Sequence, residues 1–83
     1  MATPAARATL QEHGISLLSL VARHVSGDFG HISLADSQAN EQAIERGGRI
    51  LSSYPLEAGS DLRVWVITES DRSSTCVLMP DDY

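Results

Sequence analysis

The feature that most constrains the fold is a pair of β-branched, apolar runs near the C-terminus with a short polar turn between them. The first run covers residues 62–69, the turn covers residues 70–73, and the second run covers residues 74–79. This pattern predicts a β-hairpin. Because both runs carry apolar side chains on both faces, the sheet they form has to be covered on two sides, by helices or by another chain.

Three helix signals precede the hairpin. Each predicted helix begins with a serine or threonine that can cap its first turn and ends at a glycine. The predicted helices cover residues 5–13, 17–25 and 34–46, and their caps are Thr3, Ser16 and Ser33. Apolar spacing predicts their core-facing side chains, which are Leu17, Leu18, Leu20, Val21 and Val25 in the second helix and Ala35, Ala39, Ala43 and Ile44 in the third.

A further strand is predicted over residues 49–54, with Pro55 as its end, so the sheet has three strands, most simply an antiparallel meander. Helices followed by strands indicate the α+β class, with two to three short helices packed on the meander. The length of 83 residues suits a single domain spanning residues 1–83. Val64 and Val66 share one face of the sheet and Trp65 shares the other with Ile67. We therefore expect a protein partner, or a homodimer, to bind through the sheet.

Charge and composition exclude several functional classes. The chain has 11 acidic residues against 6 basic ones, a net charge of -5 that argues against direct nucleic-acid binding. No apolar run approaches the roughly 20 residues that span a bilayer, so we expect no membrane association and a cytoplasmic location. The lone cysteine, Cys76, cannot form an internal disulfide and is predicted to be a buried strand residue.

His24, Asp28 and His31 have a spacing that could suit a metal, but Gly27 breaks the helical register between them. A zinc site also needs further ligands, so we predict neither a metal nor another cofactor. His24 and Asp28 form a possible polar site instead. We expect His24 to bind free carbonyl groups at its helix end and Asp28 to bind backbone amides of the next turn.

The hairpin turn is the second candidate site. An arginine beside hydroxyl groups, as at Arg72 and Thr75, can hold a phosphate or a carboxylate. The alternative is structural, with Asp71 shaping the turn and Glu69 pairing with Arg72. The predicted protein-contact residues are Trp65, Asp71, Arg72 and Thr75.

The serines at positions 52 and 53 lack the sequence context of a hydrolase nucleophile, and no catalytic residue is predicted.

Several segments spread over nearly the whole chain resemble a family of small proteins carried on bacterial plasmids, integrative elements and similar mobile DNA. They are Arg23-His24, Gly27–Gly30, Asn40, Gly47–Tyr54, Trp65–Thr75 and Leu78–Tyr83. Some members carry a type I restriction-subunit label, although a chain of 83 residues has no room for a methyltransferase domain. The chain departs from the family pattern at two positions. Phe29 stands where members of the family can also have a tryptophan, and His31 stands where the family pattern has an acidic residue. The resemblance implies an accessory role on a mobile element and no known reaction.

These observations favour a non-enzymatic protein-interaction module of a mobile genetic element, acting as an antagonist of a host defence system. One alternative is a small ribonuclease or toxin, whose site would consist of His24, Asp28, Arg72 and Thr75. Another is a plasmid regulator that acts through a partner, because no basic recognition helix is evident.

Overall fold

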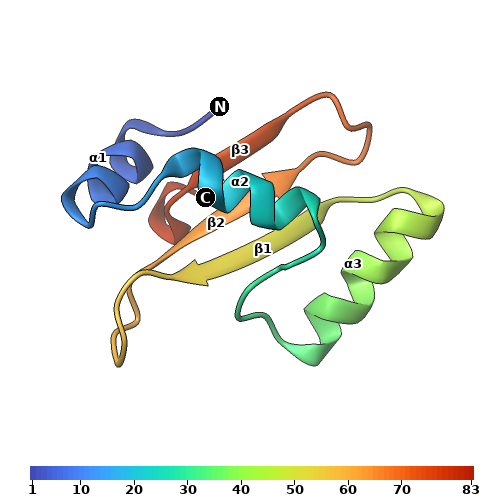
Figure 1. Ribbon diagram of the computed structural model, residues 1–83. Helices are drawn as coiled ribbons and strands as arrows, with labels where there is room; N and C mark the ends of the chain where they lie inside the picture. Colours follow the sequence, from blue (N-terminus) through green and yellow to red (C-terminus); the bar gives the residue numbers. More distant parts are fainter.

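The computed structural model describes residues 1–83 and contains three helices followed by three strands (Figure 1). The strands pair antiparallel in the order β1-β2-β3, which confirms the α+β class and the predicted meander. None of the helices has the length and apolar character needed to cross a membrane. The elements are α1 (Pro4–Glu12), α2 (Leu17–Val25), α3 (Leu34–Arg46), β1 (Ile50–Pro55), β2 (Arg63–Thr68), β3 (Thr75–Leu78) and a terminal 3-10 turn, η1 (Pro80–Asp82).

The predicted helix caps are confirmed. The side chains of Thr3, Ser16 and Ser33 accept hydrogen bonds from the backbone N–H groups three residues later, at 3.2, 3.3 and 3.1 Å. α2 and α3 span their predicted ranges, and α1 begins and ends one residue earlier than predicted. Pro55 belongs to β1 as its last residue. Local capping chemistry therefore determines where the helices start.

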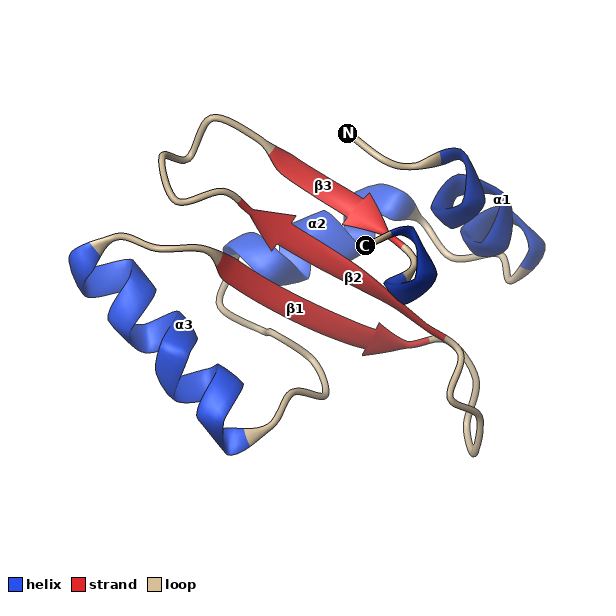
Figure 2. Ribbon diagram, turned by 180° about the vertical axis from the view of Figure 1, so that it is seen from behind, coloured by secondary structure: helices blue, strands red, loops and turns tan.

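The inner face of the sheet is the face covered by α1 and α2, and it holds the main core. Figure 2 shows α2 behind the sheet and η1 in front of it, so the two lie on opposite faces. Seven buried side chains from α1, α2 and the inner face pack together, namely Ala6, Leu10, Leu20, Tyr54, Val64, Val66 and Val77.

α2 presents a different set of residues to the core than predicted. Leu18 and Val25 are each 74% exposed, whereas His24 is only 4% exposed. The reason is chemical, because this end of the inner face carries the hydroxyl groups of Ser52 and Thr68, which His24 can bind. The prediction that Leu18 and Val25 face the core is wrong.

α3 packs beside β1 (Figure 1), but of the predicted alanine line only Ala43 is buried. Ala35 and Ala39 are exposed, and Ile44 is 60% exposed. The buried residues are Ala43 and Asn40. A strand edge presents unpaired backbone groups, so a polar side chain such as that of Asn40 satisfies it better than alanine does.

The outer face of the sheet, opposite α2, is partly covered by the C-terminal residues. Tyr83 meets Trp65 edge to face, with ring centroids 5.9 Å apart, and leaves Trp65 half-buried. Ile67 and Leu78 beside it are each 7% exposed. Cys76, which was predicted to be buried, is half-buried on this face. Apart from Tyr83 itself, which is 70% exposed, the largest exposed apolar side chains therefore lie on the helices and at the N-terminus, and not around Trp65.

Both edges of the sheet are closed by other parts of the chain. At β1, the backbone of residues 29–31 pairs with Ser53 through bonds of 2.8 and 3.0 Å. At β3, residues 1–3 pair with Val77 in the same parallel manner. Such closure leaves these edge positions unavailable for the addition of a foreign strand.

Candidate functional site

A groove of about 260 Å³ lies beside the C-terminal end of α2, between α2, α3 and the β2–β3 hairpin. We call it the α2–α3 groove, and its lining residues are His24, Val25, Gly27, Phe29, Ile44, Ile50, Thr68, Arg72 and Thr75. Val25 from α2 and Ile44 from α3 contribute aliphatic side chains that are 74% and 60% exposed. The groove thus combines an exposed apolar wall with polar groups.

His24, Thr68 and Thr75 of the groove belong to one hydrogen-bond network with Ser52. His24 Nδ1 lies 2.6 Å from Ser52 Oγ, and His24 Nε2 lies 2.8 Å from Thr68 Oγ1. Thr68 Oγ1 in turn lies 2.9 Å from Thr75 Oγ1. Burial lowers the pKa of His24, because a charged imidazolium is disfavoured there. The expectation that His24 binds carbonyl groups at the end of its own helix is wrong.

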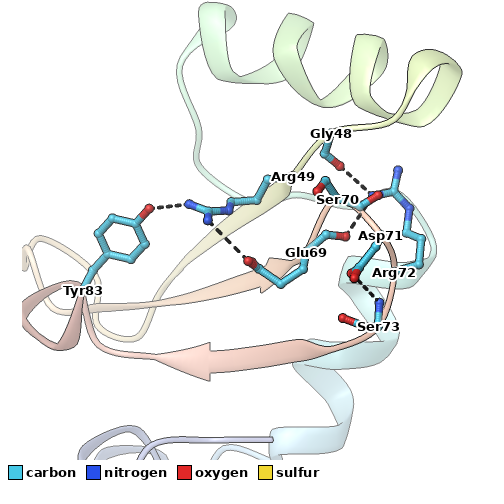
Figure 3. A network of polar contacts seen from close by, with 8 residues as sticks. All are labelled: Gly48, Arg49, Glu69, Ser70, Asp71, Arg72, Ser73 and Tyr83. Atoms are coloured by element: carbon cyan, nitrogen blue, oxygen red, sulfur yellow. Dashed lines mark hydrogen bonds and ion pairs between the residues drawn. The ribbon is translucent and has the colours of Figure 1, made fainter.

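Arg72 connects the hairpin turn to the end of α3 (Figure 3). Its Nη1 donates to the carbonyl of Gly48 at 2.6 Å and to that of Glu69 at 3.1 Å, and its Nη2 donates to the carbonyl of Ala43 at 2.9 Å. The Glu69 carboxylate pairs with Arg49 at 3.3 Å, so the expected Glu69–Arg72 ion pair is wrong. Arg72 therefore acts on backbone carbonyl groups within this chain.

Asp71 shapes the same turn, as the structural alternative predicted. Its Oδ1 accepts a hydrogen bond from the Ser73 N–H at 3.0 Å (Figure 3). Hydrogen bonds from Ser73 lower the pKa of the Asp71 carboxyl. Arg49, which pairs with Glu69 of the hairpin, also donates a hydrogen bond to the Tyr83 hydroxyl (Figure 3). Arg49 therefore connects the C-terminal residue to the hairpin.

Asp28 stabilises the loop between α2 and α3 through hydrogen bonds to its carboxylate. Its Oδ2 accepts from Arg23 Nε at 2.7 Å, and its Oδ1 accepts from the Gly30 N–H at 3.3 Å, which confirms the predicted bond to a backbone amide. The Arg23 hydrogen bond lowers the pKa of Asp28. The Arg23 guanidinium lies 4.5 Å from the centre of the Tyr54 ring, and the Tyr54 hydroxyl donates to the Asp28 carbonyl at 2.6 Å.

Of the predicted site residues, the structure brings three into the α2–α3 groove and leaves three outside it. His24, Arg72 and Thr75 line the groove, whereas Asp28, Asp71 and Trp65 do not. Thr68 was not singled out from the sequence, although aligning the two hairpin strands places it opposite Thr75. The sequence around Val25 and Ile44 does not predict their exposure, because their spacing also suits side chains that face the core.

The size and polarity of the groove limit what it can bind. Small-molecule sites usually have volumes of about 300–1,000 Å³, and the α2–α3 groove falls just below that range at about 260 Å³. No buried side-chain polar atom lacks a hydrogen-bond partner. Nowhere do three or more His, Cys, Asp or Glu side chains gather as a metal site would require. The groove is therefore smaller than a typical small-molecule site, and its apolar lining includes Val25 and Ile44.

No protein-family model, curated protein or solved structure matches this chain. The resemblance to the mobile-element family stays a prediction carried by the residues quoted above.

Proposed function

We propose that this protein is a non-enzymatic protein-binding module of a mobile genetic element, with a host defence protein as its partner. The α2–α3 groove is the proposed binding surface. The mobile-element context comes from the sequence resemblance, whereas the choice of surface comes from the geometry of the groove.

The observation that carries this proposal is the exposure of Val25 and Ile44 on the two sides of one groove. Fully burying an exposed valine or isoleucine side chain stabilises a complex by about 1.5–3 kcal/mol. Two such side chains beside a concave surface supply the apolar centre that protein interfaces typically have.

The polar side of the groove supports recognition better than catalysis. Both ring nitrogens of His24 are hydrogen-bonded, and the residue is 4% exposed. The guanidinium of Arg72 is occupied by backbone carbonyl groups, so it has few donors left for a transition state. Asp28, the other member of the ribonuclease-like set, is paired with Arg23 outside the groove.

A photocrosslinking amino acid placed at position 44 tests the proposal in a bacterial host. Leu18 provides the matched control, because it is as exposed as Val25 and lies on the same helix, but does not line the groove. We expect a discrete crosslinked product with another protein from position 44 and position 25, and none from position 18. Equal products from all three positions, or a product made only of two copies of this chain, would contradict the proposal.

A further inference from the structure

We propose, building on the proposed function, that the segment bound in the α2–α3 groove is an amphipathic α-helix with a basic flank. The secondary structure of this segment follows from the closed edges of the sheet. Asn40 occupies the β1 edge at Leu51, residues 29–31 occupy it at Ser53, and residues 1–3 occupy the β3 edge. A partner cannot add a strand at these positions, which favours a segment whose backbone hydrogen bonds are internal, as they are in a helix.

The charge of the segment follows from the carboxylates next to Ile44. At 100° per residue, Glu41 and Glu45 lie within about 100° of Ile44 on the surface of α3. Both are exposed, and neither makes an ion pair. Arg46, the basic residue of α3, projects from the opposite side of the helix by the same geometry. Two free carboxylates beside an exposed aliphatic side chain complement a helix that carries lysine or arginine next to its apolar stripe.

Arg72 is the arginine that lines the groove. Its position reduces its electrostatic repulsion of a basic partner. Its guanidinium faces the carbonyl groups of Ala43 and Gly48 at the C-terminal end of α3. The partial negative charge of that helix end offsets the charge of the arginine. The free charges close to Ile44 are therefore acidic.

A second copy of this chain is a poorer occupant of the groove. It would bring Glu41 and Glu45 of one molecule close to the same acidic face of the other. Each copy also carries a net charge of -5, so association is opposed by repulsion between like charges. A basic partner removes this repulsion.

Two designed helical peptides of about 14 residues, near the length at which an isolated helix is marginally stable, test the inference on the full chain. Both carry the same leucine stripe, flanked by lysines in one peptide and by glutamates in the other. Fluorescence anisotropy should show at least tenfold tighter binding of the leucine–lysine peptide, with an affinity that falls as salt rises. Equal affinity for the two peptides, or no binding of either, would overturn the inference.

Matched variants separate specific docking from general attraction between opposite charges. Ile44→Ser should abolish binding of the leucine–lysine peptide, and the double variant Glu41→Gln/Glu45→Gln should weaken it about tenfold. Glu12→Gln/Asp81→Asn changes the net charge equally at exposed carboxylates outside the groove, and should leave the affinity unchanged. Equal weakening by both double variants would overturn the inference. Crosslinking from position 44 decides the proposed function separately, because it does not depend on the chemistry of the peptide.

Discussion

Asn40 of α3 binds both backbone polar groups of Leu51 in β1. Its Nδ2 donates to the Leu51 carbonyl at 2.7 Å, and its Oδ1 accepts from the Leu51 N–H at 3.0 Å. The carboxamide thus takes the place that a neighbouring strand would fill. Asn40 is 2% exposed, so water cannot readily replace it when the side chain is removed.

Asn40→Ala should lower the free energy of unfolding by about 2 kcal/mol or more, because two largely buried backbone groups lose their partner. Urea denaturation followed by circular dichroism measures this loss. Gln38→Ala is the control, since Gln38 is exposed on the same helix, and it should change stability by less than about 0.5 kcal/mol. Similar losses in the two variants would show that the Asn40 bonds contribute little.

His24 should carry its proton on Nε2. Ser52 is fully buried, and its hydroxyl group has His24 Nδ1 as its hydrogen-bond partner, so it donates to an unprotonated Nδ1. His24 Nε2–H then donates to Thr68, whose hydroxyl group donates to Thr75. Long-range ¹H–¹⁵N spectra report the tautomer directly. A protonated Nδ1 at neutral pH would contradict this hydrogen-bond order.

The same burial predicts the sign of the pH dependence at His24. Its pKa is lowered in the folded state from an ordinary value of 6.5. The unfolded chain therefore binds the proton more readily, and the stability contributed by neutral His24 is complete above about pH 6.5 and is lost as the pH falls below it. A histidine resonance that titrates below 6.5 is expected. A value for His24 above 6.5 would contradict the prediction.

His13 should have the opposite pH dependence. Its Nε2 lies 2.7 Å from Glu57 Oε1, and this hydrogen bond raises the pKa of His13 above 6.5. The pair stabilises the fold fully below that value, and its contribution is lost as the pH rises through the higher folded-state pKa. The difference in urea midpoint between the native chain and Glu57→Gln should therefore shrink from about pH 5.5 to pH 8. Glu41→Gln is the control at an exposed site, and its difference in urea midpoint from the native chain should not depend on pH. A pH-independent difference for Glu57→Gln would contradict the proposed pairing of His13 with Glu57.

The boundaries of the elements could be predicted to within one residue because their determinants are local. Thr3, Ser16 and Ser33 cap helices with bonds that span three residues. Two β-branched, apolar runs flank a short polar turn, and this arrangement also indicates their antiparallel pairing. These signals lie within a few residues of the feature they determine, so a single sequence is sufficient to read them.

The orientation of α2 and α3 could not be predicted in the same way. Apolar spacing indicates which side chains share a helix face, but it does not show that a strand edge or a buried hydroxyl group needs a polar partner. His24 binds Ser52 and Thr68, which follow it by 28 and 44 positions in the chain. Asn40 binds Leu51 at the edge of the sheet. Because these partners become neighbours only in the fold, the exposed positions of Val25 and Ile44, and hence the groove, were missed.

Arg72 is the one non-glycine residue with a positive φ, at 63°. Arg72→Gly and Arg72→Ala both remove the guanidinium bonds to α3, but only alanine retains the cost of the left-handed backbone, about 1 kcal/mol. We expect both variants to be destabilised, and Arg72→Gly to be the more stable of the two. Chemical denaturation gives the comparison. An alanine variant at least as stable as the glycine variant would show that the turn relaxes to a negative φ.

Gly30 should be the glycine least tolerant of substitution. A Cβ atom there would lie 2.2 Å from the Ser53 carbonyl oxygen and 2.7 Å from Tyr54 Cδ1, and its φ is +71°. Gly59 has a similar φ of +74° with no atom within 4 Å of the added Cβ, so it isolates the backbone cost of about 1 kcal/mol. Gly30→Ala should cost about 3 kcal/mol or more, because relieving the clash breaks the bonds of residues 29 and 31 to Ser53. Thermal and urea unfolding of the two variants measures the difference. Equal costs would mean that residues 29–31 do not pack against β1, and would reopen that sheet edge to a foreign strand.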